Sequence, residues 1–151
     1  MSAVIEGHHD DHHHGPAKGI TRWLYTTNHK DIGSLYLWFS FIMLFIGGAM
    51  AMVIRAELFE PGSQIVSPEF YNQMVTNHGL IMVFGVIMPA FVGFANWLIP
   101  MQIGAPDMAL PRLNNLSFWI LPAAFGVLLS TFFMEGGAPN FGWTFYAPLS
   151  T

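Results

Sequence analysis

His78 lies in a stretch of sequence, residues 74–100, that contains no aspartate, glutamate, lysine or arginine. A stretch this apolar is expected inside a lipid bilayer, where an ionisable side chain is costly and usually functional. Neutral imidazole is a good ligand for haem iron. Two interpretations follow from the residue type alone: His78 binds a metal centre between helices, or it forms a hydrogen bond with a neighbouring helix.

Small or polar residues share the helix face of His78. At 3.6 residues per turn, Gly85 and Pro89 fall about 20° to either side of it, and Asn96 lies directly below at roughly 27 Å. The other faces carry Leu, Ile, Met, Val and Phe, so this stripe is expected to face protein or a cofactor rather than lipid. Gly79 and Gly85 would leave room for a flat macrocycle beside the imidazole.

A second polar group, formed by Asn96, Asp107 and Asn114, lies toward the other end of this apolar stretch. A carboxylate in a short loop, with asparagines at the facing ends of two helices, could order a chain of waters that collects protons. The alternative is structural. Asp107 and Arg112 would then form a loop ion pair, while Asn114 and Asn115 cap the following helix.

Three further side chains, Arg55, Tyr71 and Trp143, are expected at the same membrane surface and depth as His78. Arg55 could pair with an anionic or carbonyl group at the edge of a buried cofactor, or extend to the membrane interface. The two aromatic residues could belong to an interfacial belt or donate hydrogen bonds to the carboxylates of a cofactor.

Three long apolar runs, at about 32–56, 70–100 and 113–134, must position these residues, and each reaches the ~20 residues needed to cross a bilayer core. The chain has 151 residues, of which 53% are hydrophobic and 9% are charged, against about 25% charged in soluble domains. It has no cysteine, which excludes disulfides and thiolate metal sites. We therefore expect an all-α, polytopic transmembrane helix bundle.

Residues 1–20 form a polar tail that holds five of the seven histidines. We expect this tail to be disordered; the alternative is a surface metal-binding tract. Four of the five basic residues fall on the N-terminal side of the membrane, so the positive-inside rule predicts a cytoplasmic N-terminus. These residues are Lys18, Arg22, Lys30 and Arg112.

Five segments occur in order along the chain: TTNHKDIGSLYL, IRAEL, NHGLIMVF, NWLIPMQIGAPDMALPRLNNLSFW and GWTFYAPL. Together they resemble the N-terminal part of subunit I of the haem-copper cytochrome c oxidases, from about Arg22 to the end of the chain. The resemblance implies three of about twelve helices in the catalytic subunit of a terminal respiratory oxidase of a bacterial inner membrane. Such an enzyme oxidises cytochrome c, reduces O2 to water and pumps protons.

The resemblance also implies roles for individual residues. His78 matches an axial ligand of the low-spin haem a iron, and Arg55 matches an arginine that hydrogen-bonds the haem a formyl group. Glu57 matches a carboxylate near an outer Ca2+ or Na+ site, and Asp107 matches the entrance carboxylate of a proton-uptake channel. The remaining matches are two asparagines that line this channel and two aromatics near the haem a propionates, namely Asn96, Asn114, Tyr71 and Trp143.

The partners that this family implies are the lipid bilayer, the remainder of subunit I, oxidase subunits II and III, cytochrome c and O2, with no nucleic acid. Family ligands for haem a3 and the copper ion Cu(B) would lie beyond residue 151, so the 151-residue chain alone is not expected to be active. One alternative is a quinol oxidase subunit I, although Phe70, Pro106 and Arg112 look like the cytochrome c branch. The other is a non-catalytic structural or transport subunit.

Overall fold

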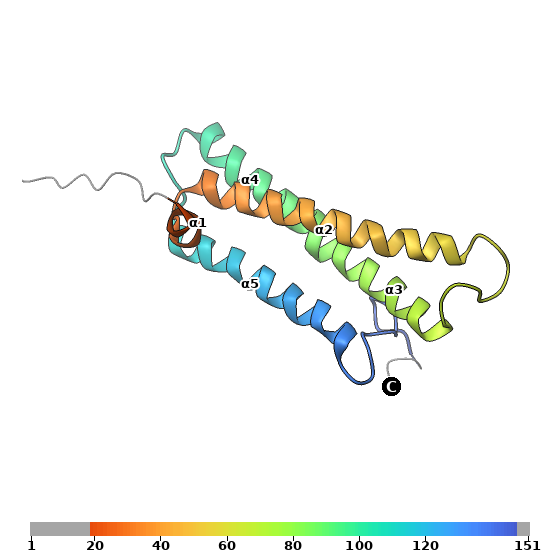
Figure 1. Ribbon diagram of the computed structural model, residues 1–151. Helices are drawn as coiled ribbons and strands as arrows, with labels where there is room; N and C mark the ends of the chain where they lie inside the picture. Colours follow the sequence, from red (N-terminus) through yellow and green to blue (C-terminus); the bar gives the residue numbers. More distant parts are fainter. Residues whose placement is uncertain (1–18, 148–151) are drawn as a thin grey trace, which may run out of the picture.

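The structure, a computed structural model, describes residues 19–147, and this part of the chain consists of helices and connecting loops with no strand (Figure 1). Three helical spans are long and apolar enough to cross a membrane: His29–Glu57, Pro68–Ile103 and Pro111–Phe133. The expected all-α transmembrane bundle is therefore confirmed. Most of the predicted histidine-rich tail, residues 1–18, lies outside the described residues.

The elements follow one another in a simple order. They are α1 (Ile20–Tyr25), α2 (His29–Glu57), α3 (Pro68–Leu80), the π-helix η1 (Ile81–Ile87), α4 (Met88–Ile103), α5 (Pro111–Ser130) and the 3-10 helix η2 (Thr131–Phe133). The apolar runs located the three spans, but they gave no sign of α1 or of the π-helical segment inside the second span.

Polar caps and prolines explain where the helices begin. The side chains of Asn28 and Ser67 each accept a hydrogen bond from a backbone N–H of the following first turn, at 2.8 and 3.3 Å. Pro68 and Pro111 are the first residues of α3 and α5. At this position a backbone N–H would have no acceptor within the helix, so proline costs no hydrogen bond there. At its far end α4 stops at Gly104, whose φ of +70° ends a helix without steric cost.

The second span changes its hydrogen-bonding pattern in the middle. The π-helix η1 ends two residues before Pro89, whose nitrogen has no hydrogen to donate to a carbonyl oxygen of the preceding turn. Ser40 of α2 donates its hydroxyl hydrogen to the carbonyl oxygen of Val86 at 2.9 Å, so the neighbouring helix helps to satisfy this irregular backbone. The consequence is a continuous 36-residue span rather than two separate helices.

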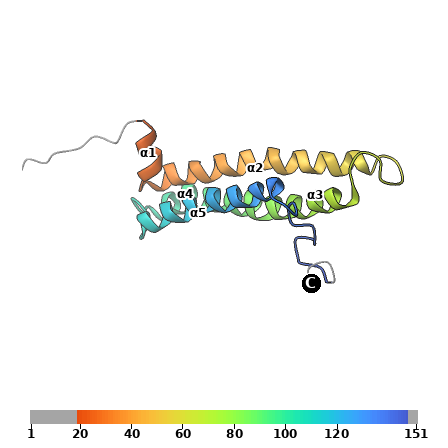
Figure 2. The ribbon, with the colours of Figure 1, turned by 60° about the horizontal axis from the view of Figure 1, so that its bottom comes forward.

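Helix α2 is the central element. It lies along the α3–η1–α4 span and also contacts α5, as Figure 2 shows from a second direction. Between α2 and α5 the core is aromatic: Tyr36 packs edge-to-face on Phe118 with ring centroids 5.2 Å apart, and Phe39 packs on Phe125 at 5.6 Å. Such pairs add to the stabilisation that burial of the rings provides.

Two glycines allow α2 and α4 to approach closely. A Cβ atom on Gly33 would lie 2.6 Å from Cδ1 of Trp97 and 2.9 Å from the carbonyl oxygen of Gly93. A Cβ on Gly93 would lie 2.9 Å from Cγ of Leu37. Small residues at such crossings are the usual means by which membrane helices come into backbone contact.

Much of the helical surface remains uncovered. In the most hydrophobic 18-residue stretch of each span, the buried share is 22% in the first span, 28% in the second and 11% in the third. Because water would be a poor solvent for these faces, lipid or further protein must cover them.

Replacement of Gly33 by alanine is expected to destabilise the bundle by about 1–3 kcal/mol, because the added methyl group overlaps Trp97 and the backbone of α4. Thermal unfolding of the purified protein in detergent measures this loss. The matched control is Gly126→Ala in α5, where a Cβ meets no atom within 4 Å. Equal melting temperatures for the two variants would contradict the close helix contact.

Candidate functional site

The imidazole of His78 is attached to the neighbouring helix through one nitrogen. Its Nδ1 atom lies 2.9 Å from the carbonyl oxygen of Gly47 in α2. A carbonyl oxygen can only accept, so Nδ1 carries the hydrogen and the lone pair of the neutral ring lies on Nε2. Metal-ligating histidines are commonly oriented in this way, by a hydrogen bond from their other ring nitrogen to a backbone carbonyl.

The chain that follows η2 folds back onto α3 beside His78 (Figure 1). The hydroxyl oxygen of Thr76 accepts a hydrogen bond from the backbone N–H of Gly142 at 2.9 Å. The amide of Asn77, which is fully buried, donates to the carbonyl oxygen of Pro139 at 3.3 Å. These bonds come from the two residues directly before His78, so they fix the returning segment at a defined position relative to the imidazole.

The two glycines expected to leave space beside His78 are covered by aromatic side chains. A Cβ on Gly79 would lie 3.1 Å from the side chain of Trp143, and one on Gly85 would lie 3.1 Å from the ring of Phe125. The prediction of open space at these two positions is therefore wrong. The absence of a side chain at Gly79 makes room for Trp143 of the returning segment, and at Gly85 it makes room for Phe125 of α5. In α2, Gly48 is a glycine that does have open space around it.

The rest of the predicted stripe does face protein. Gly85, Pro89 and Asn96 are all buried, although the π-helical turns change the phase on which the prediction relied. The expectation that this face turns away from lipid is confirmed for these three residues.

Arg55 does not lie at the depth that the sequence suggested. The ring of His78 bonds to Gly47, which precedes Arg55 by eight residues and hence by about 12 Å along α2. Arg55 is exposed, and within residues 19–147 its guanidinium has no hydrogen-bond or ion-pair partner. A bound group that contacts both His78 and Arg55 would therefore have to span this distance of about 12 Å.

Glu57 and Tyr71 line a small cavity of about 220 Å3 at the same end of the helices. The Glu57 side chain is only 6% exposed, and it accepts hydrogen bonds from the backbone N–H groups of Gln64, Ile65 and Val66 at 2.7, 2.8 and 3.0 Å. It therefore closes the α2–α3 loop. The described part of the chain holds no group of three or more His, Asp or Glu residues able to bind a metal, so the outer Ca2+ or Na+ site stays a prediction.

At the opposite end, one cavity of about 330 Å3 is lined by Asn96, Asp107 and Asn114 together. Nδ2 of Asn114 donates to Oδ1 of Asn96 at 2.8 Å and also lies 3.1 Å from the sulfur of Met108. Asp107 accepts the backbone N–H of Met108 at 2.8 Å. The three predicted residues thus line one path from an exposed loop carboxylate to a buried amide. Among the described residues no hydrogen bond joins Asp107 to either asparagine, and the rest of the lining is apolar.

The structural alternative for these residues is not supported. The one ion pair among the described residues joins Arg22 to Asp31, at 2.7 Å, so Asp107 and Arg112 are not paired. The cap residue of α5 is Leu110, which places Asn114 inside the helix.

Sequence reasoning missed His29, although it lies beside this path. It is buried, and its Nδ1 donates to the backbone carbonyl of Asn96 at 2.8 Å. That carbonyl lacks its usual helical partner because the residue four positions later, Pro100, has no N–H. The signal in the sequence is a histidine at the start of an apolar run, paired with a proline inside another.

A hydroxyl relay was missed as well. Ser117 donates to the backbone carbonyl of Asn114 at 2.7 Å, so the hydroxyl of Tyr36 must be the donor in its own 2.8 Å bond to Ser117. Tyr36 is 3% exposed, so these two hydroxyl groups connect the Asn114 backbone to the aromatic core.

Comparison with known proteins identifies the family. Residues 31–151 match the family described as Cytochrome C and Quinol oxidase polypeptide I. The chain belongs to this family. Haem and copper are the cofactors expected for it.

The individual relatives agree with this assignment. The chain is 49% identical over 138 residues to cytochrome c oxidase subunit 1 of Corynebacterium diphtheriae, which covers 90% of this chain and 24% of the relative. It is 50% identical over 137 residues to a probable cytochrome c oxidase subunit 1-alpha of Streptomyces avermitilis, covering 89% and 23%. The chain thus spans about a quarter of the length of the curated relatives it matches.

The residues around His78 fit a haem. The ring is held through Nδ1, Nε2 carries the lone pair, and Gly48, which follows Gly47 in sequence, has open space in place of a side chain. One buried polar atom beside it, Oδ1 of Asn77, has no hydrogen-bond partner among the described residues.

Replacement of Thr76 by valine is expected to loosen the returning segment, because the buried N–H of Gly142 loses its acceptor at a cost of about 1–3 kcal/mol. Amide hydrogen exchange in peptides covering residues 136–147 would then be faster in the purified complex. Thr76→Ser keeps the hydroxyl group and serves as the control. Unchanged exchange in the valine variant would show that this bond does not hold the segment.

Proposed function

We propose that the chain is the N-terminal part of the catalytic subunit of a terminal respiratory oxidase in a bacterial inner membrane. The complete enzyme would take electrons from cytochrome c, reduce O2 to water and pump protons across the membrane. The observation that carries the proposal is the orientation of His78, whose Nδ1–H is bound by the Gly47 carbonyl at 2.9 Å while Nε2 stays available to a metal.

In this proposal His78 is an axial ligand of the low-spin haem a iron. The bound haem a supplies one-electron transfer between the donor and the oxygen-reducing centre. The hydrogen bond to Gly47 fixes the orientation of the imidazole and makes Nε2 a better electron donor. Arg55 is proposed to hydrogen-bond the haem formyl group, and Tyr71 and Trp143 to lie near the propionates. The contact of Trp143 with Gly79, next to His78 in sequence, supports the last assignment.

The cavity at the other end is proposed to admit protons. Asp107 is exposed in the loop and lines this cavity, and Asn114 and Asn96 lead from it into the bundle. Amide side chains can both donate and accept, so they can orient waters without holding a proton themselves. His29 and Ser117 keep the two asparagines in place by binding their backbone carbonyls. This end of the helices, together with the N-terminus, is proposed to face the cytoplasm.

The remaining parts of the enzyme are proposed from the family. Haem a3 and Cu(B) would be held by the remainder of subunit I, and subunits II and III would complete the complex. A Ca2+ or Na+ ion near Glu57 is proposed on the same basis. The relatives are named as cytochrome c oxidase subunits, which favours cytochrome c over quinol as the electron donor. Comparison of reduced cytochrome c with a quinol as donors to the purified complex decides between them.

Replacement of His78 by glycine is expected to abolish the low-spin haem absorption band of the complete complex, because the iron loses an axial ligand. Added imidazole should restore the band, which separates loss of the ligand from failure of assembly. A low-spin spectrum that persists in the variant without imidazole would rule out ligation by His78 and favour a non-catalytic role.

Replacement of Asp107 by asparagine is expected to slow turnover by about 10²-fold and to reduce proton pumping, because the uncharged amide cannot collect protons at the surface. The haem spectrum should not change. Oxygen consumption and proton release by reconstituted vesicles give the two rates, and Glu135→Gln, which removes an acid beyond α5, is the control. Normal pumping in Asp107→Asn would argue against proton uptake through this cavity.

A further inference from the structure

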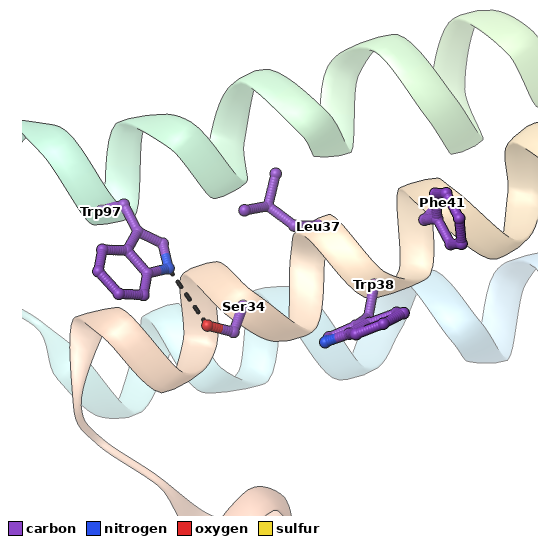
Figure 3. A pocket seen from close by; sticks show the side chains of 5 residues that line it. All are labelled: Ser34, Leu37, Trp38, Phe41 and Trp97. Carbon is purple, nitrogen blue, oxygen red and sulfur yellow. Dashed lines mark hydrogen bonds between the residues drawn. The ribbon is translucent and has the colours of Figure 1, made fainter.

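An open groove on the outer surface of the bundle has no part in either site described above. It has a volume of about 370 Å3 and runs between the first half of α2 and the last turns of α4 (Figure 3). Its lining is mostly apolar, and two of its residues are largely exposed, Trp38 at 63% and Phe41 at 50%. The lining residues are Ser34, Leu37, Trp38, Phe41 and Trp97.

Polarity changes in one direction along this groove. Its polar end carries Ser34, whose hydroxyl oxygen accepts a hydrogen bond from Nε1 of Trp97 at 3.2 Å, as Figure 3 shows. The ammonium group of Lys30 lies 5.8 Å from the centroid of the same indole ring. Beyond Ser34 the groove is lined on α2 by Leu37, Trp38 and Phe41, which are hydrophobic apart from the indole N–H of Trp38. The groove therefore has a cation beside its polar end and a mostly apolar remainder.

The length of this gradient matches one leaflet of a bilayer. Lys30 and Phe41 are eleven residues apart, which corresponds to about 16 Å along the helix. Half of a bilayer hydrocarbon core is about 15 Å thick. A molecule with one charged end and a chain of that length would therefore occupy the whole groove.

The charge at the polar end is not neutralised within the described residues. Arg22, the nearest other cation in sequence, forms a two-bond ion pair with Asp31, at 3.0 and 2.7 Å. Lys30 is exposed and has no acidic partner in residues 19–147; its described contact is the indole face of Trp97. A cation held at a membrane interface in this way attracts an anionic head group.

We propose that this groove binds one anionic phospholipid, with its phosphate at Lys30 and one acyl chain along Leu37, Trp38 and Phe41. The occupant is a lipid rather than a protein helix because the one unpaired cation lies beside one end of the groove, while the lining beyond Ser34 is formed by large hydrophobic side chains. The head group has to be anionic because Lys30 offers the unpaired charge.

Titration of the delipidated, purified complex with dioleoyl phosphatidylglycerol, followed by native mass spectrometry, tests the head-group contact. Lys30→Gln is expected to weaken binding of one phosphatidylglycerol about fivefold. The matched control is Arg112→Gln, which removes an exposed cation from the first turn of α5 and should leave the affinity unchanged. Dioleoyl phosphatidylcholine should bind the native complex more weakly at this site. Equal binding of the two lipids, or no effect of Lys30→Gln, would overturn the proposal.

Photocrosslinking identifies the occupant of the apolar end. Phe41→p-benzoylphenylalanine places a reactive ketone in the groove of the otherwise complete complex. Irradiation of native membranes should yield an adduct whose added mass is that of an anionic phospholipid. An adduct with another segment of protein would show that a helix covers the groove, and a neutral lipid adduct would refute the head-group assignment. Each result decides the proposal even if one substitution affects assembly.

Discussion

A backbone carbonyl inside a membrane has to find its hydrogen-bond donors within the protein, and side chains of adjacent helices bond to such carbonyls at three levels of the bundle. His29 bonds to Asn96, Ser40 bonds to Val86, and His78 bonds to Gly47. All three contacts join α2 to the second span. Such hydrogen bonds between helices help to set the position of one helix against another.

These contacts link the two ends of the molecule. The second span carries His78 near one surface and Asn96 near the other, and α2 is bonded to it at both levels. Close approach at Gly33 and Gly93 removes the space in which the helices could slide. The haem ligand and the proton cavity of the proposed enzyme are therefore features of one rigid helix pair, to which α5 adds Asn114 and an aromatic surface.

The sequence was sufficient to predict those features that depend on composition and on residues close together in the chain. Length and hydropathy identified the three spans, and helical periodicity placed Gly85, Pro89 and Asn96 on a buried face. The grouping of Asp107, Asn96 and Asn114 followed from two helix ends and a short loop. The roles of these three residues in proton uptake, and the role of Glu57 at a cation site, remain predictions.

Other features depend on contacts between distant parts of the chain and could not be predicted. A single sequence does not say that Trp143, beyond the third span, returns to cover Gly79, or that Phe125 fills the space at Gly85. The π-helix arises from Pro89 together with Ser40 of another helix, and neither residue alone indicates it. The position of Arg55 at the end of its apolar run also misjudged its depth relative to His78, because the level of the imidazole depends on which carbonyl it reaches.

The pairing of Pro100 with His29 has a consequence for which substitutions the two helices tolerate. By removing its own N–H, the proline leaves the Asn96 carbonyl to an imidazole Nδ1. A residue with a backbone N–H at position 100 would compete with the imidazole for the same carbonyl oxygen. The proline of one helix and the histidine of the other therefore act as a matched pair, and a change at either position removes the reason for the other.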